Sequence, residues 1–374
     1  MALMPVAEAL GRVLADATPL AAETVPLTDA LGRVLTQDVT ALRTQPPASV
    51  SAMDGYAVRA DNVAGAPVIL DIIGEVAAGH PFEGAVGAGQ AVRIFTGGVV
   101  PEGADAVVVQ EVTQREGDCV TVQKPVATGR NIRRAGIDFT QGEVLLKKGQ
   151  RLSDRDLMLA AAMNHPALSV HRRPKIAIVG TGDELVPPGT TPGPGEIVFS
   201  NGFALSALVR RQGAEVADLG IAHDRIEDIV AKVRAARDWG ADVLVTTGGA
   251  SVGEHDLVQR ALAAEGLDLS FWRVALRPGR PMMHGKLGAM QVLGLPGNPV
   301  SSYVCAFLFL VPLIRRLAGR ADVEPTAEAA RLGRDLPEND ERQDYLRASL
   351  EGGPDGLVAT PLASQDSSQH ISNR

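Results

Sequence analysis

Apolar side chains recur at helical spacing within the first 40 residues of the chain. Positions three and four apart share one face of a helix, so the spacing predicts that residues 1–40 are largely helical. A Pro-rich stretch at 44–51 (TQPPASVS) then breaks the pattern. The apolar positions are Val6, Ala9, Leu10, Val13, Leu14, Leu27, Leu31 and Val34.

The pattern changes to short β-rich runs between about residues 52 and 135. Clusters of Gly, Pro and Asp separate these runs, which favours a small β domain. A second break at 129–142 leads to an apolar run at 157–163, where Ser153 is placed as a helix cap and Asp156 follows three residues later. The β domain is therefore expected to be inserted between two helical segments. The β-rich runs are 68–73, 91–95, 106–109 and 120–122.

Strand and helix patterns alternate from Lys175 onward. The run KIAIVG at 175–180 is apolar throughout, as in a strand that is buried on both faces. Repeated strand–helix units predict a parallel, doubly wound α/β sheet. Asp224 and Glu227 are placed as the N-cap and N3 residues of one helix. Further strands are expected at 216–221, at 242–247 and before Pro296, and helices at 201–213, from 226 past 233, at 257–265 and from Pro299 to Gly319.

Together these patterns predict a multidomain α/β protein. A chain of 374 residues is too long for one compact core, so two to four domains are expected. Two strand-like runs near the end, at 345–350 and 356–362, indicate a small appended β domain. The expected domains are a helical, elongated one (1–45 with 136–172), the inserted β domain (46–135), the doubly wound α/β core (173–322) and the C-terminal β domain (323–374).

The composition excludes several classes of protein. The net charge is −8 and aromatic residues make up 3% of the chain, which argues against binding to nucleic acid. The longest apolar run, 303–314, is shorter than the about 20 residues of a membrane span and contains Pro312. No leader pattern is visible, so a cytoplasmic protein without a membrane partner is expected. Cys119 and Cys305 lie far apart and indicate neither a disulfide framework nor a zinc site.

Three Gly-rich loops follow expected strands, at 180–185, 246–256 and 294–302. In an open parallel sheet such loops converge on one edge, where ligands bind. Glycines let backbone N–H groups approach an anion, and helix N-termini favour negative charge. One such loop is ordinary turn chemistry, but three predict a phosphate or oxyanion site. Its expected binding residues are Gly248, Gly249, Ser251, Gly253, Pro296, Gly297, Asn298 and Ser301.

Charged side chains accompany these loops. Glu184 and Asp256 follow different strands, so they could meet and hold Mg²⁺. Asp256 is also placed to cap the helix that it precedes, as Asp224 is for its own helix. Arg273, Arg277 and Arg280 surround a Pro-Gly-Arg-Pro turn at 278–281 in an acidic protein, and guanidinium groups bind oxyanions in a bidentate manner.

Two motifs in the inserted β domain are typical of turns. Asp54-Gly55, between strand-like residues, is the commonest hairpin signal. Thr96-Gly-Gly also favours a turn.

With these motifs in this order, the chain resembles the MoeA family, the molybdopterin molybdenumtransferases. The resemblance runs from residue 1 to about 370. It implies a MoaB/MogA-like α/β core and insertion of molybdate into adenylylated molybdopterin, with Mg²⁺-dependent release of AMP. The motifs are SAMDGYAV, FTGGVVPEGADAVVVQE, NIRRAGIDF, VGTGDEL, TTGGASVGEHD, RPGRP and GLPGNPVSS.

The resemblance also implies roles for individual residues and a partner. Glu184 and Asp256 match the Mg²⁺ ligands, and the subunits are expected to form a homodimer with a composite active site. The molybdopterin adenylyltransferase is a possible protein partner. Positions that match the family's active site are Asp54, Thr96, Asp138, Glu184, Asp224 and Asp256; those that match its molybdate pocket are Ser251, Arg277, Pro278, Ser301, Arg347 and Ser368.

Two features depart from the family's pattern. Many bacterial members carry lysine at Arg273, Arg277 and Arg280, and arginine cannot give up a proton as lysine can. The family's C-terminal β domain also continues past the QDSS segment at 365–368, so fewer strands are expected there. Two alternative functions remain open: a non-catalytic dimeric scaffold of the same fold, and a molybdopterin adenylyltransferase.

Overall fold

The computed structural model describes residues 3–248, 257–279, 281–354 and 356–365. Its contacts divide the chain into two compact units. The α/β unit consists of Met1–Gln37, Lys148–Ser153 and Leu168–Arg374, and the β unit of Asp38–Lys147 and Asp154–Ala167. The β unit is thus inserted into the chain of the α/β unit, whereas the finer division into four domains stays a prediction.

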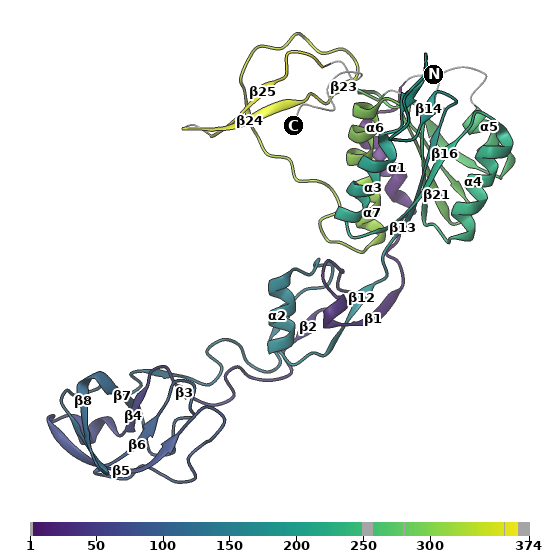
Figure 1. Ribbon diagram of the computed structural model, residues 1–374. Helices are drawn as coiled ribbons and strands as arrows, with labels where there is room; N and C mark the ends of the chain where they lie inside the picture. Colours follow the sequence, from purple (N-terminus) through teal and green to yellow (C-terminus); the bar gives the residue numbers. More distant parts are fainter. Residues whose placement is uncertain (1–2, 249–256, 280, 355, 366–374) are drawn as a thin grey trace. The chain divides into compact units, whose positions relative to one another are not determined.

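A six-stranded sheet forms the centre of the β unit (Figure 1). Its strand order is β7–β4–β6–β5–β9–β8, and every neighbouring pair is antiparallel except β5 with β6. The four β-rich runs of the sequence all lie in this sheet, so their prediction is confirmed. The bounds are β4 Gly55–Val58, β5 Val68–Val76, β6 Gln90–Ile94, β7 Ala106–Val109, β8 Thr113–Glu116 and β9 Cys119–Val122.

Smaller elements complete the β unit. Helix α2, Asp154–Ala162, forms where the sequence predicts it. Two short antiparallel pairs join distant parts of the chain: β2 (Val39–Thr40) with β11 (Val144–Leu146), and β3 (Val50–Ser51) with β10 (Ile132–Arg133).

The first of the two N-terminal helical runs is confirmed, and the second is wrong. Helix α1, Val6–Ala15, buries Val6, Ala9 and Val13. The second run, Leu27 to Val34, forms only a 3-10 turn at Leu27–Asp29, and strand β1 (Ala22–Pro26), which precedes it, pairs with β12 (Ala167–His171). Val34 and Leu35 then bridge to Arg151 and Val170. Pairing with strands far along the chain has overridden the local apolar spacing.

The α/β unit is built on a second six-stranded sheet, in the order β16–β13–β17–β21–β20–β18. The first four strands are parallel, as expected, but β20 is antiparallel to both of its neighbours, β21 and the edge strand β18. The predicted α/β class is confirmed, and the all-parallel sheet is corrected. The bounds are β13 Lys175–Thr181, β16 Glu215–Ala222, β17 Val243–Thr247, β18 Asp268–Trp272, β20 Met283–Leu287 and β21 Met290–Leu295.

Helices cover both faces of this sheet (Figure 1). Ile176 and Ile178 of β13 pack in the core with α1, α3 and α7, whereas Ala177 and Val179 pack in the core with α4 and α5. This alternation follows from the two-residue period of a strand. The bounds are α3 Asn201–Arg211, α4 Ile226–Asp238, α5 Leu257–Ala264, α6 Pro299–Cys305 and α7 Val311–Leu317, with short strands β14 Leu185–Val186, β15 Ile197–Val198 and β19 Leu276–Arg277.

The predicted cap of α4 is wrong. Its N-cap is Arg225, without a side-chain cap, and Glu227 is the second helical residue. The backbone N–H of Asp224 donates instead to Asp183 Oδ1, 3.0 Å away. By contrast, Asn298 caps α6 as expected, because its side chain accepts from the N–H of Ser301.

The last helical stretch is longer than its apolar run in the sequence. Helix α6, a π-helical turn at Ala306–Leu310 and α7 follow one another over Pro299–Leu317, 19 residues whose length and composition would suffice to cross a membrane. The expectation that this run is too short is therefore corrected. Phe309, Leu310 and Leu313 are fully buried in the core of the α/β unit. Buried core helices can have the same length and apolar composition as a membrane span.

The strand-like runs near the end of the chain form a small sheet, as predicted. Its order is β22–β25–β24, and a further strand, β23, pairs in parallel with β19 of the α/β unit. The bounds are β22 Arg331–Leu332, β23 Gln343–Asp344, β24 Ala348–Gly353 and β25 Gly356–Pro361.

A buried histidine should make the stability of the α/β unit depend on pH. His284 is 2% exposed, its Nε2 lies 2.9 Å from Gln291 Oε1, and its Nδ1 has no partner among the described residues. Burial lowers the pKa of His284 below its ordinary value of 6.5, so the unfolded chain binds more protons than the folded chain. The contribution of this group to stability is complete above pH 6.5 and declines as the pH falls towards the folded pKa.

We therefore expect His284→Gln to flatten the pH dependence of stability on the acidic side. The slope contributed by one such group is at most about 1.4 kcal/mol per pH unit. Melting temperatures at pH 7.5 and 5.5 check this for both proteins. An equal fall in the wild type and the variant would assign the acid sensitivity to other groups.

Candidate functional site

The three strand-end loops of the α/β unit converge, as the sequence predicts. The Thr181 hydroxyl lies 3.4 Å from the Thr247 carbonyl oxygen, so the first loop adjoins the second. A Cβ atom on Gly297 would lie 3.3 Å from the Cα of Gly248, so the second loop adjoins the third. The N–H of Gly248 also donates to the Leu295 carbonyl. Carboxyl ends of parallel strands therefore form one loop edge, which is the usual ligand position in this type of sheet.

Gly248 is required at this edge for two reasons. Its φ of +94° disfavours other residues, and a Cβ there would overlap the Thr181 carbonyl oxygen. Beside it, the hydroxyls of Thr246 and Thr247 are buried and have no partner among the described residues. These threonines are potential donors that the sequence analysis missed, although both stand in the TTGG motif. Gly249, Ser251, Gly253 and Asp256 lie outside the described residues.

Carboxylates gather beyond β13 and β16 on the same edge. Asp183 accepts from the N–H of Asp224, and its Oδ1 lies 3.3 Å from Nδ1 of His223. The carboxylate of Glu184 folds over Gly182, and both Glu184 and Asp224 are exposed. The structure thus joins the loops of Glu184 and Asp224 through Asp183, which adjoins Glu184 in the sequence.

A mostly apolar cavity of about 360 Å³ lies between α3 and α6. Asn201 and Ser302 contribute polar groups, and Arg347 also lines the cavity. The Asn201 amide donates to the Gly297 carbonyl, 2.8 Å away, which links this cavity to the third loop. Arg347, one of the implied molybdate-pocket residues, therefore lies near the loop edge; Ser368 is outside the described residues.

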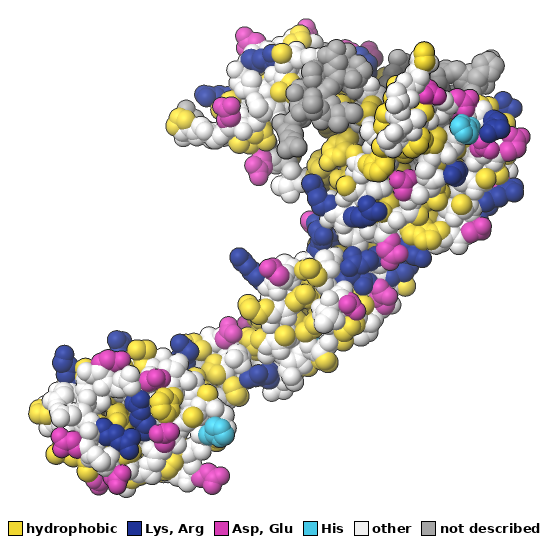
Figure 2. All heavy atoms as spheres, viewed as in Figure 1, with side chains coloured by type: hydrophobic (Ala, Val, Ile, Leu, Met, Phe, Trp, Pro, Cys, Tyr) yellow, Lys and Arg dark blue, Asp and Glu magenta, His cyan; other side chains and the backbone are white. Residues whose placement is uncertain are grey.

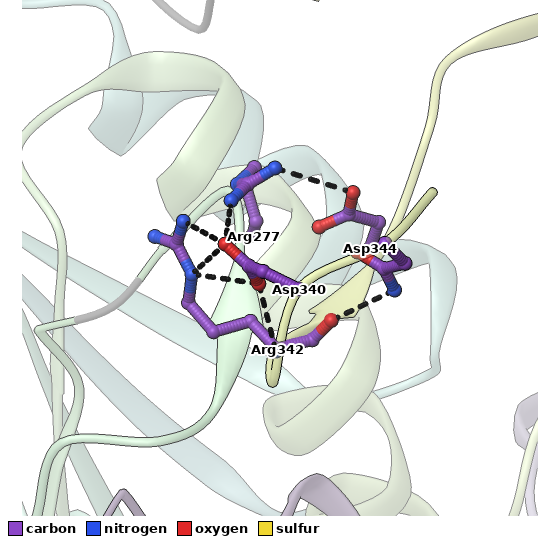
Figure 3. A network of polar contacts seen from close by, with 5 residues as sticks. Arg277, Asp340, Arg342 and Asp344 are labelled. Carbon is purple, nitrogen blue, oxygen red and sulfur yellow. Dashed lines mark hydrogen bonds and ion pairs between the residues drawn. The ribbon is translucent and has the colours of Figure 1, made fainter. Parts of the chain in front are cut away.

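Arg277 lies in an ion-pair network with the C-terminal segment (Figure 3). Its Nη2 contacts Asp340 and its Nη1 lies 3.4 Å from Asp344 Oδ2. Asp340 also binds Arg342, and neither aspartate was singled out in the sequence. Arg277 therefore has two carboxylates of the C-terminal segment as its partners.

The turn that follows Arg277 is tightly packed. Gly279 approaches Cys305 so closely that a Cβ would overlap the sulfur. Burial raises the pKa of Cys305 to about 12, so this thiol is not a nucleophile at neutral pH. Arg273 stacks near Trp272, at 5.8 Å from the ring centroid, and has a φ of +93°. Arg280 lies outside the described residues.

Other arginines of the α/β unit serve helix ends. Arg210, Arg211, Arg315 and Arg316 stand in the last turns of α3 and α7, where Figure 2 shows dark-blue side chains gathered. Positive charge at a helix C-terminus is stabilised by the helix dipole. These residues are therefore explained by local structure, and we assign them no part in the site.

The β unit contains predicted site residues of its own. Asp54 Oδ1 accepts two hydrogen bonds from Thr96, one from its N–H and one from its hydroxyl, both at 2.8 Å. These bonds lower the pKa of Asp54, which stays ionised. Arg93 lies over the rings of Tyr56 and Phe95 beside this pair. Asp138 is exposed, and its N–H donates to the Gln45 carbonyl.

Comparison with known proteins decides the family. Residues 4–164 match the family model described as the MoeA N-terminal region (domain I and II), and residues 177–316 match that of a probable molybdopterin binding domain. A molybdopterin molybdenumtransferase from Bacillus subtilis (strain 168) is 35% identical over 373 residues, 98% of this chain and 86% of that protein. The chain belongs to the MoeA family.

Two further relatives agree with this assignment. The molybdopterin molybdenumtransferase of Nostoc sp. is 37% identical over 339 residues, 88% of this chain and 77% of that protein. The crystal structure of a molybdopterin biosynthesis MoeA protein from Pyrococcus horikoshii OT3 superposes with a TM-score of 0.82 at 31% identity, covering 99% of this chain and 92% of that one. The resemblance and the multidomain α/β fold inferred from the sequence are both confirmed.

Proposed function

We propose that the chain inserts molybdate into adenylylated molybdopterin and releases AMP in an Mg²⁺-dependent reaction. Membership of the MoeA family makes it a transferase of molybdenum-cofactor biosynthesis. The observation that carries the finer proposal is the convergence of three Gly-rich loops on one sheet edge, with Arg277 on the same domain. Backbone N–H groups and a guanidinium are suited to phosphate and molybdate oxygens.

The carboxylates at the loop edge fit Mg²⁺. The ion prefers oxygen ligands and needs only one or two carboxylates, because it keeps several waters. Glu184 is exposed beyond β13, with Asp183 beside it. The described residues contain no group of three His, Cys, Asp or Glu that could hold a metal ion, so the site would depend on Asp256, waters and substrate oxygens as well. We propose Glu184 and Asp256 as the metal-binding residues. When bound, Mg²⁺ would neutralise charge on the phosphate groups of the substrate.

The chain's own residues then have distinct tasks. We propose that Gly248, Gly297 and the N-terminus of α6 bind the phosphate groups, while Arg277 and Ser301 bind molybdate. The N–H of Ser301 donates to the side chain of Asn298, and this cap fixes the first turn of α6. Arg273 and Arg280 would contribute positive charge, and Pro278 the shape of the turn after Arg277. Asp54 and Thr96 of the β unit provide an ionised carboxylate held in one orientation.

We also propose that the enzyme is a cytoplasmic homodimer that receives its substrate from a molybdopterin adenylyltransferase. These points rest on the family resemblance. Light scattering of the purified chain would determine its mass in solution.

Release of AMP tests the proposed reaction. Purified chain is mixed with adenylylated molybdopterin, Mg²⁺ and molybdate, and AMP is measured by chromatography. We expect AMP release to require molybdate and Mg²⁺, and Arg277→Met to raise the molybdate concentration that gives half-maximal release by about tenfold or more, the loss of a hydrogen bond to a charged group. Arg316→Met removes an exposed arginine at a helix end. It should change neither the rate of AMP release nor the molybdate concentration that gives half-maximal release.

Binding of the nucleotide without formation of active cofactor at any molybdate concentration would contradict the proposal. Consumption of ATP without AMP release would instead favour an adenylyltransferase.

A further inference from the structure

The guanidinium of Arg277 is shared between two carboxylates from the C-terminal segment (Figure 3). The side chains of Arg277 and Asp340 are 44% and 46% exposed, whereas Asp344 is 21% exposed. Solvent and small anions can therefore reach the contact between Arg277 and Asp340. An oxyanion that binds Arg277 must share or replace these carboxylates as its partners.

Asp340 has a second cation of its own. Arg342 Nη2 lies 2.6 Å from Asp340 Oδ2, Nε lies 3.2 and 3.3 Å from its two carboxylate oxygens, and the N–H of Arg342 donates to Oδ1 at 2.9 Å. These contacts with Arg342 hold the pKa of Asp340 well below its usual range, so the carboxylate is charged throughout the neutral range. Asp340 would consequently remain paired after Arg277 leaves it.

The backbone of the segment is attached independently of these side chains. Strand β23 pairs with β19, and the N–H groups of Gln343 and Tyr345 donate to the carbonyls of Ala275 and Arg277 at 2.8 Å each. Leu276, between those two carbonyls, is fully buried. The Arg277 side chain can therefore change partner while the segment stays in place.

We propose that Asp340 is a competing counter-ion for Arg277, which exchanges this carboxylate for the incoming oxyanion within the oxyanion pocket proposed above. Asp340 thereby lowers the affinity of the pocket for oxyanions, because an anion binds only if its interaction with Arg277 is stronger than that of the Asp340 carboxylate. Arg342 stabilises the released carboxylate, and Asp344 retains Arg277 near the turn at Pro278. The exchange moves no proton and breaks no covalent bond.

Removal of the competing charge should strengthen oxyanion binding. An exposed ion pair between such groups is weak, so we expect Asp340→Asn to tighten the binding of molybdate to the full chain by about two- to fivefold. Titration calorimetry with sodium molybdate at fixed ionic strength measures this. Asp335→Asn, which removes an exposed carboxylate from the same segment, is the matched control and should leave the affinity unchanged.

A double-variant cycle separates competition from a structural effect. If Asp340 acts through Arg277, Asp340→Asn should have no effect on molybdate affinity in an Arg277→Met background. Unchanged or weaker binding by Asp340→Asn with Arg277 present would overturn the exchange, as would the same gain without Arg277. A melting temperature equal to that of the wild type confirms that the segment is still folded in Asp340→Asn. Arg342→Met gives an independent readout: without Arg342, Asp340 should pair more firmly with Arg277, so molybdate should bind more weakly.

The cycle also distinguishes this exchange from the wider function. If Arg277→Met leaves molybdate binding unchanged, the oxyanion pocket itself is wrong. If Arg277→Met weakens binding but Asp340→Asn does not strengthen it, the pocket stands and only the exchange fails.

Discussion

Replacement of Gly55 by alanine should destabilise the β unit by about 3 kcal/mol or more. Gly55 begins β4, which lies between β6 and β7, and a Cβ there would overlap the carbonyl oxygen of Val108. The obstacle is a backbone atom of a paired strand, so no side-chain rotation relieves it. Thermal unfolding of the full chain, followed by calorimetry, should show the transition of the β unit at a lower temperature or absent.

Gly65→Ala provides the matched control for this change. Gly65 is exposed in the same unit, no heavy atom would lie within 4 Å of its Cβ, and its φ is not positive. We expect this variant to melt with the wild type. Equal stability of the two alanine variants would mean that β4 and β7 do not pack as described.

Gly55 also shows why local sequence chemistry misleads. Asp54-Gly55 is a strong hairpin signal, yet Gly55 lies within a strand and its φ is not positive. The glycine is needed because another strand approaches it, and that strand lies about 50 residues further along the chain. A dipeptide cannot reveal such an approach.

The same distinction runs through the rest of the fold. Strands β13 and β17 are apolar on both faces, so their burial is visible in the sequence itself. The spacing of Leu27, Leu31 and Val34 is equally regular, but β1 and the bridges of Val34 and Leu35 pair with segments more than 100 residues away. Periodicity shows how apolar side chains repeat along the chain. Pairing with distant segments decides whether that stretch of backbone forms a helix or a strand.

The candidate site divides in a similar way. The convergence of Gly-rich loops that follow strands can be predicted from the sequence, because the sheet topology places the ends of those strands at one edge. The partners of Arg277 cannot be predicted in this way, because Asp340 is 63 residues away and lies in a segment without a recognisable motif. Asp183 is predictable from the sequence, because it adjoins Glu184 in the Gly-rich loop at 180–185.

Replacement of Asp54 by asparagine should lower the rate of AMP release by about two to three orders of magnitude, the usual loss when a positioned acid–base carboxylate is removed. Asp54 Oδ1 receives both donors of Thr96, so its orientation is fixed and its pKa lies below the ordinary value. Asparagine keeps the shape and can still accept from Thr96, but it has no charge and cannot accept a proton. The melting temperature should therefore change little while kcat falls.

Two further variants define what Asp54 contributes. Thr96→Val removes the hydroxyl donor and leaves the backbone donor, so we expect a smaller loss, about tenfold. Asp61→Asn removes an exposed carboxylate of the same unit that forms a local ion pair with Arg59, and it should behave as the wild type. If Asp54→Asn and Asp61→Asn released AMP at equal rates, the ionised carboxylate of Asp54 would have no part in the reaction, and the Asp54–Thr96 pair would be a structural element of the loop that precedes β4.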